Sequence, residues 1–287
     1  MIGNSIERPS GGAAFCGIAV MAKASAPGST KTRLVPPLTY SEAAAFNTAF
    51  LKDVAQNILT AGRRASIAGY MAYGPPGGAT FLRENSPPEF GLFEASSPNF
   101  GDCLCSAICE LLKRSHCSAI VLNSDSPTLP TTLLLEAAEV LARPGDQVVL
   151  GPATDGGYYL LGLKKPHRRL FEDIAWSSSR VAEQTFERAK ELGLKLHLLA
   201  PWYDVDDAEG LGRLDVEITS GRSSNPALQP YEARHTAQLL RSIFGANGCA
   251  DRLGATGREK AKPLLDGSQV STDISQRIRS HVEPNRD

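Results

Sequence analysis

Short apolar runs alternate with amphipathic stretches over most of this chain. Six of the apolar runs are typical of β-strands, at 16–22, 67–73, 119–122, 148–150, 158–163 and 194–199. Apolar residues at helical spacing lie between several of them, as at Phe46, Phe50, Val54 and Ile58 and at Leu133, Leu134, Ala137, Val140 and Leu141. We expect Ser41 to cap the first of these helices. Strands that alternate with helices favour an α/β fold with a mostly parallel central sheet flanked by helices.

The pattern changes toward the C-terminus. Two further helices are expected, from Ser178 or Ser179 to about Leu192 and from a cap at Asp206 or Asp207 to about Val216. Residues 221–226 have the composition of a linker, and 230–244 have the pattern of an accessory helix. We therefore divide the chain into a disordered tail at 1–14, a main domain at 15–218, a linker and accessory helix at 219–245, and a disordered tail at 246–287.

A basic loop that contains glycine follows the first predicted strand closely. It runs from Pro27 to Arg33 and includes Gly28 and Lys31. Glycine permits unusual backbone angles, small residues leave backbone amides approachable, and the two cations supply charge, so the loop is suited to bind phosphate. It is neither a Walker A loop nor a dinucleotide-binding fingerprint, because the glycine spacing of both is missing.

Composition narrows the class of protein. The 287 residues are 42% hydrophobic and 21% charged, which is ordinary for a soluble globular enzyme with one substantial core. A formal net charge of −1 gives no broad cationic surface, so a nucleic-acid polymer is not expected as the main ligand. Residues 1–15 lack a secretory signal pattern and no apolar run approaches the roughly 18 residues of a membrane span, so we expect a cytoplasmic protein. The 6 cysteines and 5 histidines show neither zinc-ligand spacing nor a disulfide framework.

Three acidic motifs accompany the basic loop, at Asn123–Pro127, Gly151–Tyr158 and Trp202–Asp207. Polar residues at the carboxyl end of a buried strand such as 119–122 are where open α/β sheets bind ligands. A hard divalent cation such as Mg²⁺ or Mn²⁺ needs only one or two carboxylates when phosphate oxygens and water complete its shell. Asp125 is the first candidate for such a ligand.

Each of these motifs also has a purely structural alternative. Asp125 could cap the turn into the next helix, and Asp204 and Asp206 could be capping or surface acids. The segment Asp155-Gly156-Gly157 is a turn signal that fits a hairpin. The two cations of the basic loop could be solvated. All of these motifs lie at strand ends. A separate structural explanation for each motif is therefore weaker than it would be if each motif stood alone.

A set of short motifs keeps a characteristic order over about residues 16–216. The set consists of Lys23, Pro27-Gly28, Lys31-Thr32-Arg33-Leu34, Asp125-Ser126-Pro127, Gly151-Pro152-Ala153, Asp155-Gly156-Gly157-Tyr158-Tyr159-Leu160, Gly162-Leu163, Trp176-Ser177, Val181, Thr185 and Asp204-Val205-Asp206. In this order it resembles a bacterial glycosyltransferase-like family, the radical-SAM/selenodomain-associated transferase 1 family, which includes arsenosugar-biosynthesis glycosyltransferases. The Gly-Pro-Ala-x-Asp-Gly-Gly-Tyr block is the most specific part of the resemblance.

The resemblance implies a GT-A fold, that of the nucleotide-diphospho-sugar transferases. Phospholactate guanylyltransferase and the molybdenum-cofactor nucleotidyltransferases are related to this family. By that analogy Lys23, Gly28, Lys31 and Arg33 bind the nucleotide and its phosphates. Kinship of fold does not by itself settle the reaction.

The resemblance also implies a metal site and a substrate site. Asp125 takes the place of the metal-binding aspartate, and Asp204 or Asp206 completes the site for Mg²⁺ or Mn²⁺. We assign the catalytic chemistry to Asp125 and Asp155, because Asp155 can bind sugar hydroxyls or act as general base for the acceptor. The substrate-binding residues are expected to be Gly156, Gly157, Tyr158 and Trp176.

Two positions depart from the family pattern. Asn123 stands where the family usually has glycine, and Ala107 stands where an arginine is expected. If that arginine binds a substrate phosphate in relatives, this protein has a different substrate or a weaker activity.

Three functions follow from these residues. The leading hypothesis is metal-dependent glycosyl transfer from a nucleoside-diphosphate sugar to a small-molecule acceptor, in which Lys31, Arg33 and the cation neutralise the leaving diphosphate. The second is nucleotidyl transfer to a phosphorylated small molecule with release of pyrophosphate. The third, motivated by Asn123 and Ala107, is a nucleotide-binding protein without turnover. Product analysis separates all three.

Overall fold

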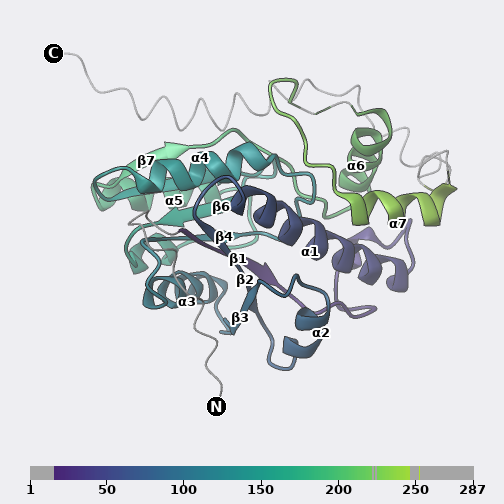
Figure 1. Ribbon diagram of the computed structural model, residues 1–287, viewed down its shortest axis with the longest axis horizontal. Helices are drawn as coiled ribbons and strands as arrows, with labels where there is room; N and C mark the ends of the chain where they lie inside the picture. The colour runs from purple at the N-terminus through teal and green to yellow at the C-terminus, as the bar shows by residue number, and fades with distance from the viewer. Residues whose placement is uncertain (1–15, 222, 224, 246–251, 253–287) are drawn as a thin grey trace.

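A seven-stranded β-sheet runs through the centre of the protein (Figure 1). The computed structural model describes residues 16–221, 223, 225–245 and 252. In sheet order the strands are β3 Gly91–Glu94, β2 Ile67–Tyr73, β1 Cys16–Ala22, β4 Ser118–Leu122, β6 Tyr158–Leu163, β5 Gln147–Pro152 and β7 Lys195–Leu198. Strand β6 runs antiparallel to both of its neighbours, and the other paired strands are parallel. The mostly parallel sheet predicted from the sequence is confirmed.

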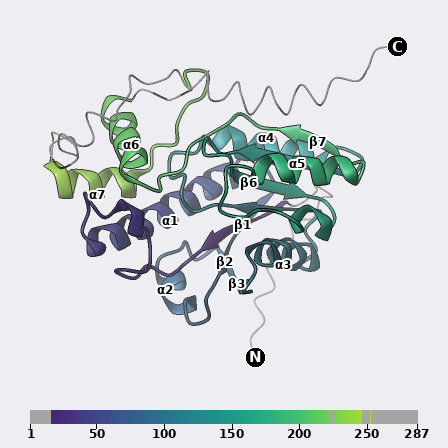
Figure 2. The ribbon, with the colours of Figure 1, turned by 180° about the vertical axis from the view of Figure 1, so that it is seen from behind.

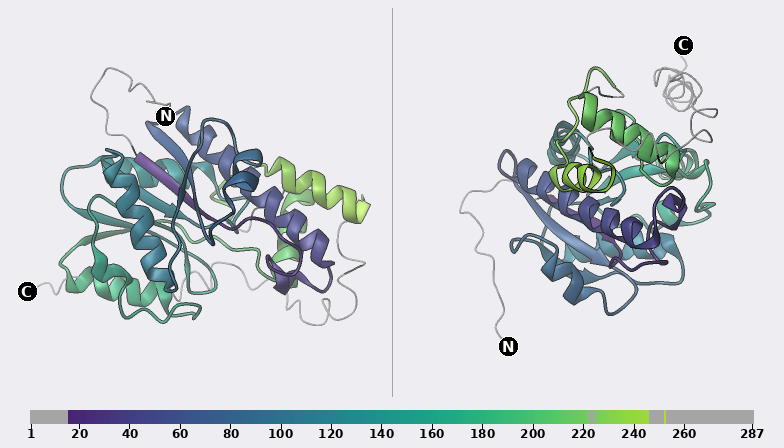
Figure 3. Two further views of the ribbon diagram at one scale, coloured as in Figure 1. Left: turned by 90° about the horizontal axis from the view of Figure 1, so that it is seen from below. Right: turned by 90° about the vertical axis from the view of Figure 1, so that its right-hand side faces the viewer.

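Helices cover both faces of this sheet (Figures 2 and 3). One face carries α1 Tyr40–Gly62, α4 Thr131–Ala142, α6 Ala208–Ser220 and α7 Arg234–Phe244. The other face carries α3 Phe100–Lys113, α5 Val181–Glu191 and the 3₁₀ turn η2 Arg168–Phe171, while α2 Ala79–Glu84 lies beside β3 and the 3₁₀ turn η1 Thr32–Leu34 precedes α1. In the part of the chain that the structure describes, no helix combines the length and the apolar content needed to cross a membrane.

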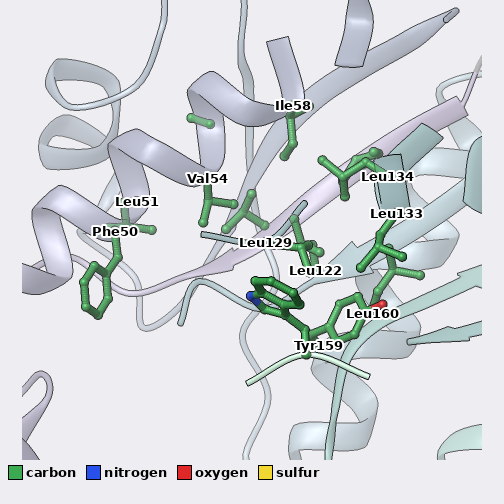
Figure 4. Packing of buried hydrophobic residues seen from close by; sticks show 14 of the residues in the cluster. Phe50, Leu51, Val54, Ile58, Leu122, Leu129, Leu133, Leu134, Tyr159 and Leu160 are labelled. Atoms are coloured by element: carbon green, nitrogen blue, oxygen red, sulfur yellow. The ribbon is translucent and has the colours of Figure 1, made fainter. Parts of the chain in front are cut away.

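The sheet has an apolar layer on each face because successive side chains of a strand point to opposite sides. In β1, Ile18 and Val20 belong to the layer under α1 and α4, whereas Ala19 belongs to the layer under α3 and α5. Figure 4 shows the first layer, where side chains of α1 and α4 meet those of β4 and β6. All residues of β4 are buried, which explains why its sequence shows no polar alternation.

Most elements expected from the sequence are present. All six expected strands occur, with ends within two residues of the expected ones. The expected cap of α1 is wrong: Thr39, not Ser41, is the N-cap. The Thr39 hydroxyl accepts from the backbone N–H of Glu42 at 3.2 Å, and the Glu42 carboxylate accepts from the backbone N–H of Thr39 at 2.8 Å. This reciprocal pair is a capping box, which satisfies two backbone donors where a serine at position 41 would satisfy one.

Strand β3 and helices α2 and α3 were not predicted from the sequence. Strand β3 has only 4 residues and α2 has 6, too few to show a period. Helix α3 did carry a signal, because its buried residues Leu104, Ile108 and Leu111 recur at helical spacing. The Asn99 side chain caps this helix by accepting from the backbone N–H groups of its first turn.

A buried carboxylate of α1 binds the first turn of α7. The side chain of Asp53, on α1, accepts from the backbone N–H of His235 at 2.9 Å and from the backbone N–H and hydroxyl of Thr236 at 2.8 and 2.6 Å. Asp53 is 1% exposed, and its burial raises its pKa although these donors oppose the rise. Asp53 therefore serves as the cap that α7 lacks in its own sequence. The tails expected at 1–14 and 246–287 lie outside the described residues apart from Arg252, and the division into domains stays a proposal.

We expect Asp53→Ala to lower the free energy of unfolding by about 2 kcal/mol, because it leaves buried donors of α7 without an acceptor. Urea unfolding followed by circular dichroism measures this change. Glu139→Ala is the control, since Glu139 is an exposed acid that forms one i,i+4 pair with Arg143, and its loss should cost less than about 0.5 kcal/mol. Equal stability of the two variants would contradict the capping role of Asp53.

Candidate functional site

The polar segments that follow β1 and β4 meet at one edge of the sheet. Strands β1 and β4 are parallel neighbours, so their carboxyl ends lie at the same edge. The segment 199–207, which follows β7, joins them there, since the backbone N–H of Val205 donates to the carbonyl of Asp125 at 2.8 Å. The basic loop and two of the three acidic motifs are therefore brought together, in the place where open α/β sheets bind ligands.

Helix α1 fixes the basic loop from one side. The buried Asn47 side chain donates to the carbonyl of Lys23 at 3.0 Å and to the hydroxyl of Ser25 at 2.8 Å. The Lys23 ammonium in turn donates to the carbonyl of Ser29 at 2.9 Å, so the residue expected to bind phosphate braces the loop in this structure. Gly28 has a φ of 75°, and nothing lies within 4 Å of the position that a Cβ would take there.

The Lys31 ammonium group lies among oxygen atoms of the acidic motifs. Its Nζ is 2.7 Å from Asp125 Oδ1, 3.0 Å from Asp206 Oδ1 and 2.8 Å from the Val205 carbonyl oxygen. The side chain is only 6% exposed, and the ring centre of Phe50 is 5.5 Å from Nζ. Burial alone would lower the pKa of Lys31, but the two carboxylates outweigh it and raise the pKa. Lys31 is thus a buried, paired cation and not a solvated charge.

Asp206 pairs with both cations of the basic loop. Its Oδ2 accepts from Arg33 Nη2 at 2.6 Å, and the Arg33 side chain is 70% exposed. The helix cap that the sequence left open between two aspartates is Asp207, which leaves Asp206 free for these pairs. Asp125 also caps no helix, because the N-cap of α4 is Pro130. The structural alternatives for Asp125 and Asp206 as helix caps therefore do not apply.

Asp204 is held by two neutral side chains that flank Asp125. Its Oδ1 accepts from Asn123 Nδ2 at 2.7 Å and from Ser126 Oγ at 2.6 Å. Burial raises the pKa of Asp204 to about 7, the charges of Asp125 and Asp155 add to the rise, and the two hydrogen bonds oppose it. Asp204 therefore changes charge near neutral pH, and its role as a metal ligand stays a prediction.

The segment Asp155-Gly156-Gly157 forms the turn between the antiparallel strands β5 and β6, so its local structure is the hairpin that the sequence left open. The Asp155 carboxylate is exposed and accepts from the backbone N–H of Gly157 at 2.9 Å. Gly156 has a φ of 95°, and a Cβ there would collide with the backbone carbonyl of Ser179. The first glycine is thus required for packing, and substrate binding by the two glycines stays a prediction.

Tyr158 and Trp176 lie in an aromatic cluster with Phe100. The ring centre of Trp176 is 5.3 Å from that of Phe100 and 6.4 Å from that of Tyr158, both in edge-to-face geometry. The Tyr158 hydroxyl is buried with no hydrogen-bond partner among the described residues, and burial raises its pKa far above the usual value. This cluster belongs to the apolar layer under α3 and α5, whereas Phe50, the ring beside Lys31, belongs to the opposite layer. Substrate binding by Tyr158 and Trp176 stays a prediction.

The site fits a hard divalent cation. Asp125 and Asp206 share one positively charged atom, Lys31 Nζ, within 3.0 Å, and their side chains are 31% and 29% exposed. The amide oxygen Oδ1 of Asn123 is buried and has no hydrogen-bond partner among the described residues. No group of three or more His, Cys, Asp or Glu side chains in the described ranges surrounds a single metal position. Two carboxylates match a Mg²⁺ or Mn²⁺ ion that keeps water and takes phosphate oxygens as its other ligands.

Comparison with known proteins gives a family match and a fold. Residues 57–178 match the model of a family described as "Uncharacterized protein conserved in bacteria (DUF2064)". A comparison with curated proteins found no match. The structure is similar to that of a protein from Desulfovibrio desulfuricans G20, named as a candidate nucleotide-diphospho-sugar transferase, with 24% identity over 79% of this chain and 97% of that chain and a TM-score of 0.65.

Two more distant structures were also found. They are a cytidylyltransferase from Leptospira borgpetersenii serovar Hardjo-bovis (12% identity, 80% of this chain, 94% of that chain, TM-score 0.46) and a mannosyltransferase from Pyrobaculum calidifontis in complex with GDP-Man and Mn²⁺ (13% identity, 94% of this chain, 83% of that chain, TM-score 0.42). The similarity to the Desulfovibrio protein confirms the predicted fold class, that of the nucleotide-diphospho-sugar transferases. The family model covers less than half of the 287 residues, and the narrower transferase 1 family stays a prediction.

Sequence reasoning missed the residues that hold the site in place. Asn123 was noted only as a departure from the family, and Ser126 only as part of a motif, although both donate to Asp204. A signal was present, because hydroxyl and amide groups next to a carboxylate at a strand end are natural donors to other acids at that edge. Asn47 gave no signal, since a single polar residue on a helix is ordinary.

We expect Asp204→Asn to stabilise the protein increasingly as the pH rises from about 4 to about 7. The folded-state pKa of Asp204 is about 7, against about 3.9 when unfolded, so its contribution to stability is fully present below pH 4 and is lost as the carboxyl ionises. The asparagine stays neutral throughout. Urea unfolding of both proteins at several pH values measures the difference, and Glu139→Gln controls for the loss of an exposed acid. A difference from wild type that does not vary with pH would contradict the raised pKa.

Proposed function

We propose that this protein is a metal-dependent glycosyltransferase that uses a nucleoside-diphosphate sugar as donor and a small molecule as acceptor. The observation that carries the proposal is the meeting of the basic loop with Asp125 and Asp206 on one buried cation, Lys31. These residues lie at the carboxyl ends of the parallel strands β1 and β4, the edge where open α/β sheets bind ligands. The fold is that of the nucleotide-diphospho-sugar transferases. An anion-binding loop beside two hard carboxylates is what a nucleoside diphosphate and its cation require.

The basic loop is proposed to bind the diphosphate of the donor. Lys31 and the exposed Arg33 supply positive charge for the diphosphate, and Gly28 lets the loop backbone approach it. Asp125 and Asp206 would hold a Mg²⁺ or Mn²⁺ ion, which would supply positive charge against the negative charge that develops on the leaving diphosphate.

The acceptor end is assigned to the turn after β5. Asp155 is exposed there, near enough to Asp204 to raise its pKa, so it can bind sugar hydroxyls or take a proton from the acceptor. Gly156, Gly157, Tyr158 and Trp176 are the proposed remainder of the substrate site.

A panel of nucleotide sugars and nucleoside triphosphates, each tested with Mg²⁺ and with Mn²⁺, identifies the donor class by thermal shift. A ligand present at about 100 times its dissociation constant stabilises the folded protein by about 2.7 kcal/mol. Product analysis with the best donor then tests the reaction. Release of a nucleoside diphosphate supports glycosyl transfer. Pyrophosphate as product would establish nucleotidyl transfer instead, and binding without any product would leave a nucleotide-binding protein.

We expect Asp125→Asn to weaken donor binding in the presence of Mg²⁺ or Mn²⁺ by about tenfold or more, because it removes one of two carboxylates that share a cation. The asparagine keeps the shape of the side chain. Calorimetric titration with the best donor, with and without a chelator, measures the effect.

Glu139→Gln is the matched control, since it also removes one negative charge, from an exposed side chain of α4 whose ion pair is with Arg143. It should bind the donor as wild type does. Equal donor affinity of Asp125→Asn and wild type, with and without the chelator, would overturn the metal assignment.

A further inference from the structure

The Lys31 ammonium is already fully hydrogen-bonded to oxygen atoms of the protein. An ammonium group has three N–H donors. Asp125, Asp206 and the Val205 carbonyl place three oxygen atoms within 3.0 Å of Nζ, and the side chain is 6% exposed. In this position Lys31 has no donor left for a phosphate oxygen. Its expected role in binding the diphosphate therefore requires it to leave at least one carboxylate.

The position that Lys31 occupies is also the one that suits a divalent cation. Asp125 and Asp206 are joined by no other cation than Lys31 Nζ among the described residues, because Arg33 contacts only Asp206. An ammonium and a metal ion repel each other and cannot lie together between the same two oxygens. With Lys31 in place, an arriving diphosphate meets the exposed Arg33 and little other positive charge. With Lys31 gone and nothing in its place, it meets an unpaired Asp125 and an Asp206 that is paired only with the exposed Arg33.

We propose that Lys31 is an exchangeable cation: it neutralises Asp125 and Asp206 before the ligands arrive, and it turns to the diphosphate when a divalent cation replaces it between these carboxylates. The proposal deepens the proposed function and rests on it. It explains how one site can hold two carboxylates and a basic loop without carrying uncompensated charge before or after the donor binds.

The loop geometry around Lys31 is consistent with such a movement. Lys31 has a φ of 51° and a ψ of 36°, a left-handed conformation that is unfavourable for lysine. Such conformations cluster at ligand-binding and switch sites. Residues 27–29 of the same loop are exposed. A lysine side chain is a flexible four-carbon stem, so its ammonium can change partner without a change of fold.

The exchange makes two ligands cooperative. A divalent cation that displaces Lys31 makes its ammonium available to the diphosphate, and a diphosphate that attracts Lys31 clears the place for the cation. Because coupling of two binding equilibria is reciprocal, each ligand tightens the binding of the other by the same factor. Removal of the Lys31 charge should remove that part of the coupling.

The test uses the full chain, Mn²⁺ as the cation and inorganic pyrophosphate as a diphosphate without base or sugar. Free Mn²⁺ is followed by electron paramagnetic resonance, and pyrophosphate binding by calorimetry with and without Mn²⁺. Lys31→Met is compared with Arg33→Met, which also removes one positive charge paired with Asp206 but does not vacate the place between the two carboxylates. Thermal unfolding with and without Mn²⁺ checks that each variant is folded, and Lys190→Met, on the exposed side of α5, controls for net charge.

We expect Lys31→Met to bind Mn²⁺ about tenfold tighter than wild type in the absence of pyrophosphate, and to bind pyrophosphate about tenfold weaker when Mn²⁺ is saturating. The factor by which Mn²⁺ tightens pyrophosphate binding should fall by about tenfold. Arg33→Met should change Mn²⁺ affinity by less than about threefold, because the Arg33 side chain is 70% exposed and its charge is screened by solvent and salt.

Three results would overturn the exchange. Unchanged Mn²⁺ affinity in Lys31→Met would make Lys31 a fixed structural pair. Equal tightening in Lys31→Met and Arg33→Met would show a general charge effect. Pyrophosphate binding by wild type that is equally tight with and without Mn²⁺ would mean that Lys31 stays in place as the permanent cation. If wild type bound neither Mn²⁺ nor pyrophosphate, the proposed function itself would be wrong, and the exchange with it.

Discussion

Repulsion between carboxylates is the constraint around which this site is built. The parallel pairing of β1 and β4 forces their carboxyl ends to one edge, and the segment after β7 adds two more acids to that edge. Three aspartates gathered there would repel one another and any anionic ligand. One buried lysine pairs with both Asp125 and Asp206, and neutral side chains donate hydrogen bonds to Asp204. The basic loop is thus needed for the folded state as well as for a ligand.

Helix α1 carries the residues that keep this arrangement in register. Asn47 holds the basic loop, Phe50 lies beside the Lys31 ammonium, and Asp53 caps α7. These residues are spaced by three along the helix, so they lie on one broad face of it. Val54 and Ile58 of the same helix point toward the sheet, as Figure 4 shows. The geometry of the site therefore depends on the packing of a helix that supplies none of its charges.

The sequence was informative where short-range patterns decide the structure. The strands were predictable because buried strands are continuous apolar runs, and the meeting of Asp125 with the basic loop was predictable because parallel strand ends share an edge. The position of the Lys31 ammonium was not predictable, since a flexible side chain can point to solvent or to an acid 175 positions away along the chain with no difference in local pattern. The role of Asn123 was hidden for the same reason: its partner Asp204 lies 81 positions further on.

The cap that Asp53 provides for α7 also determines which fragment of the protein can be studied. A shortened chain that ended at Ser220 would keep the whole sheet and every residue of the candidate site. It would also leave the Asp53 carboxylate without its three donors, on the same face of α1 that positions the basic loop. Loss of α7 would then change how the loop is held, although no residue of α7 belongs to the candidate site. The smallest unit suitable for binding studies accordingly extends at least through Phe244.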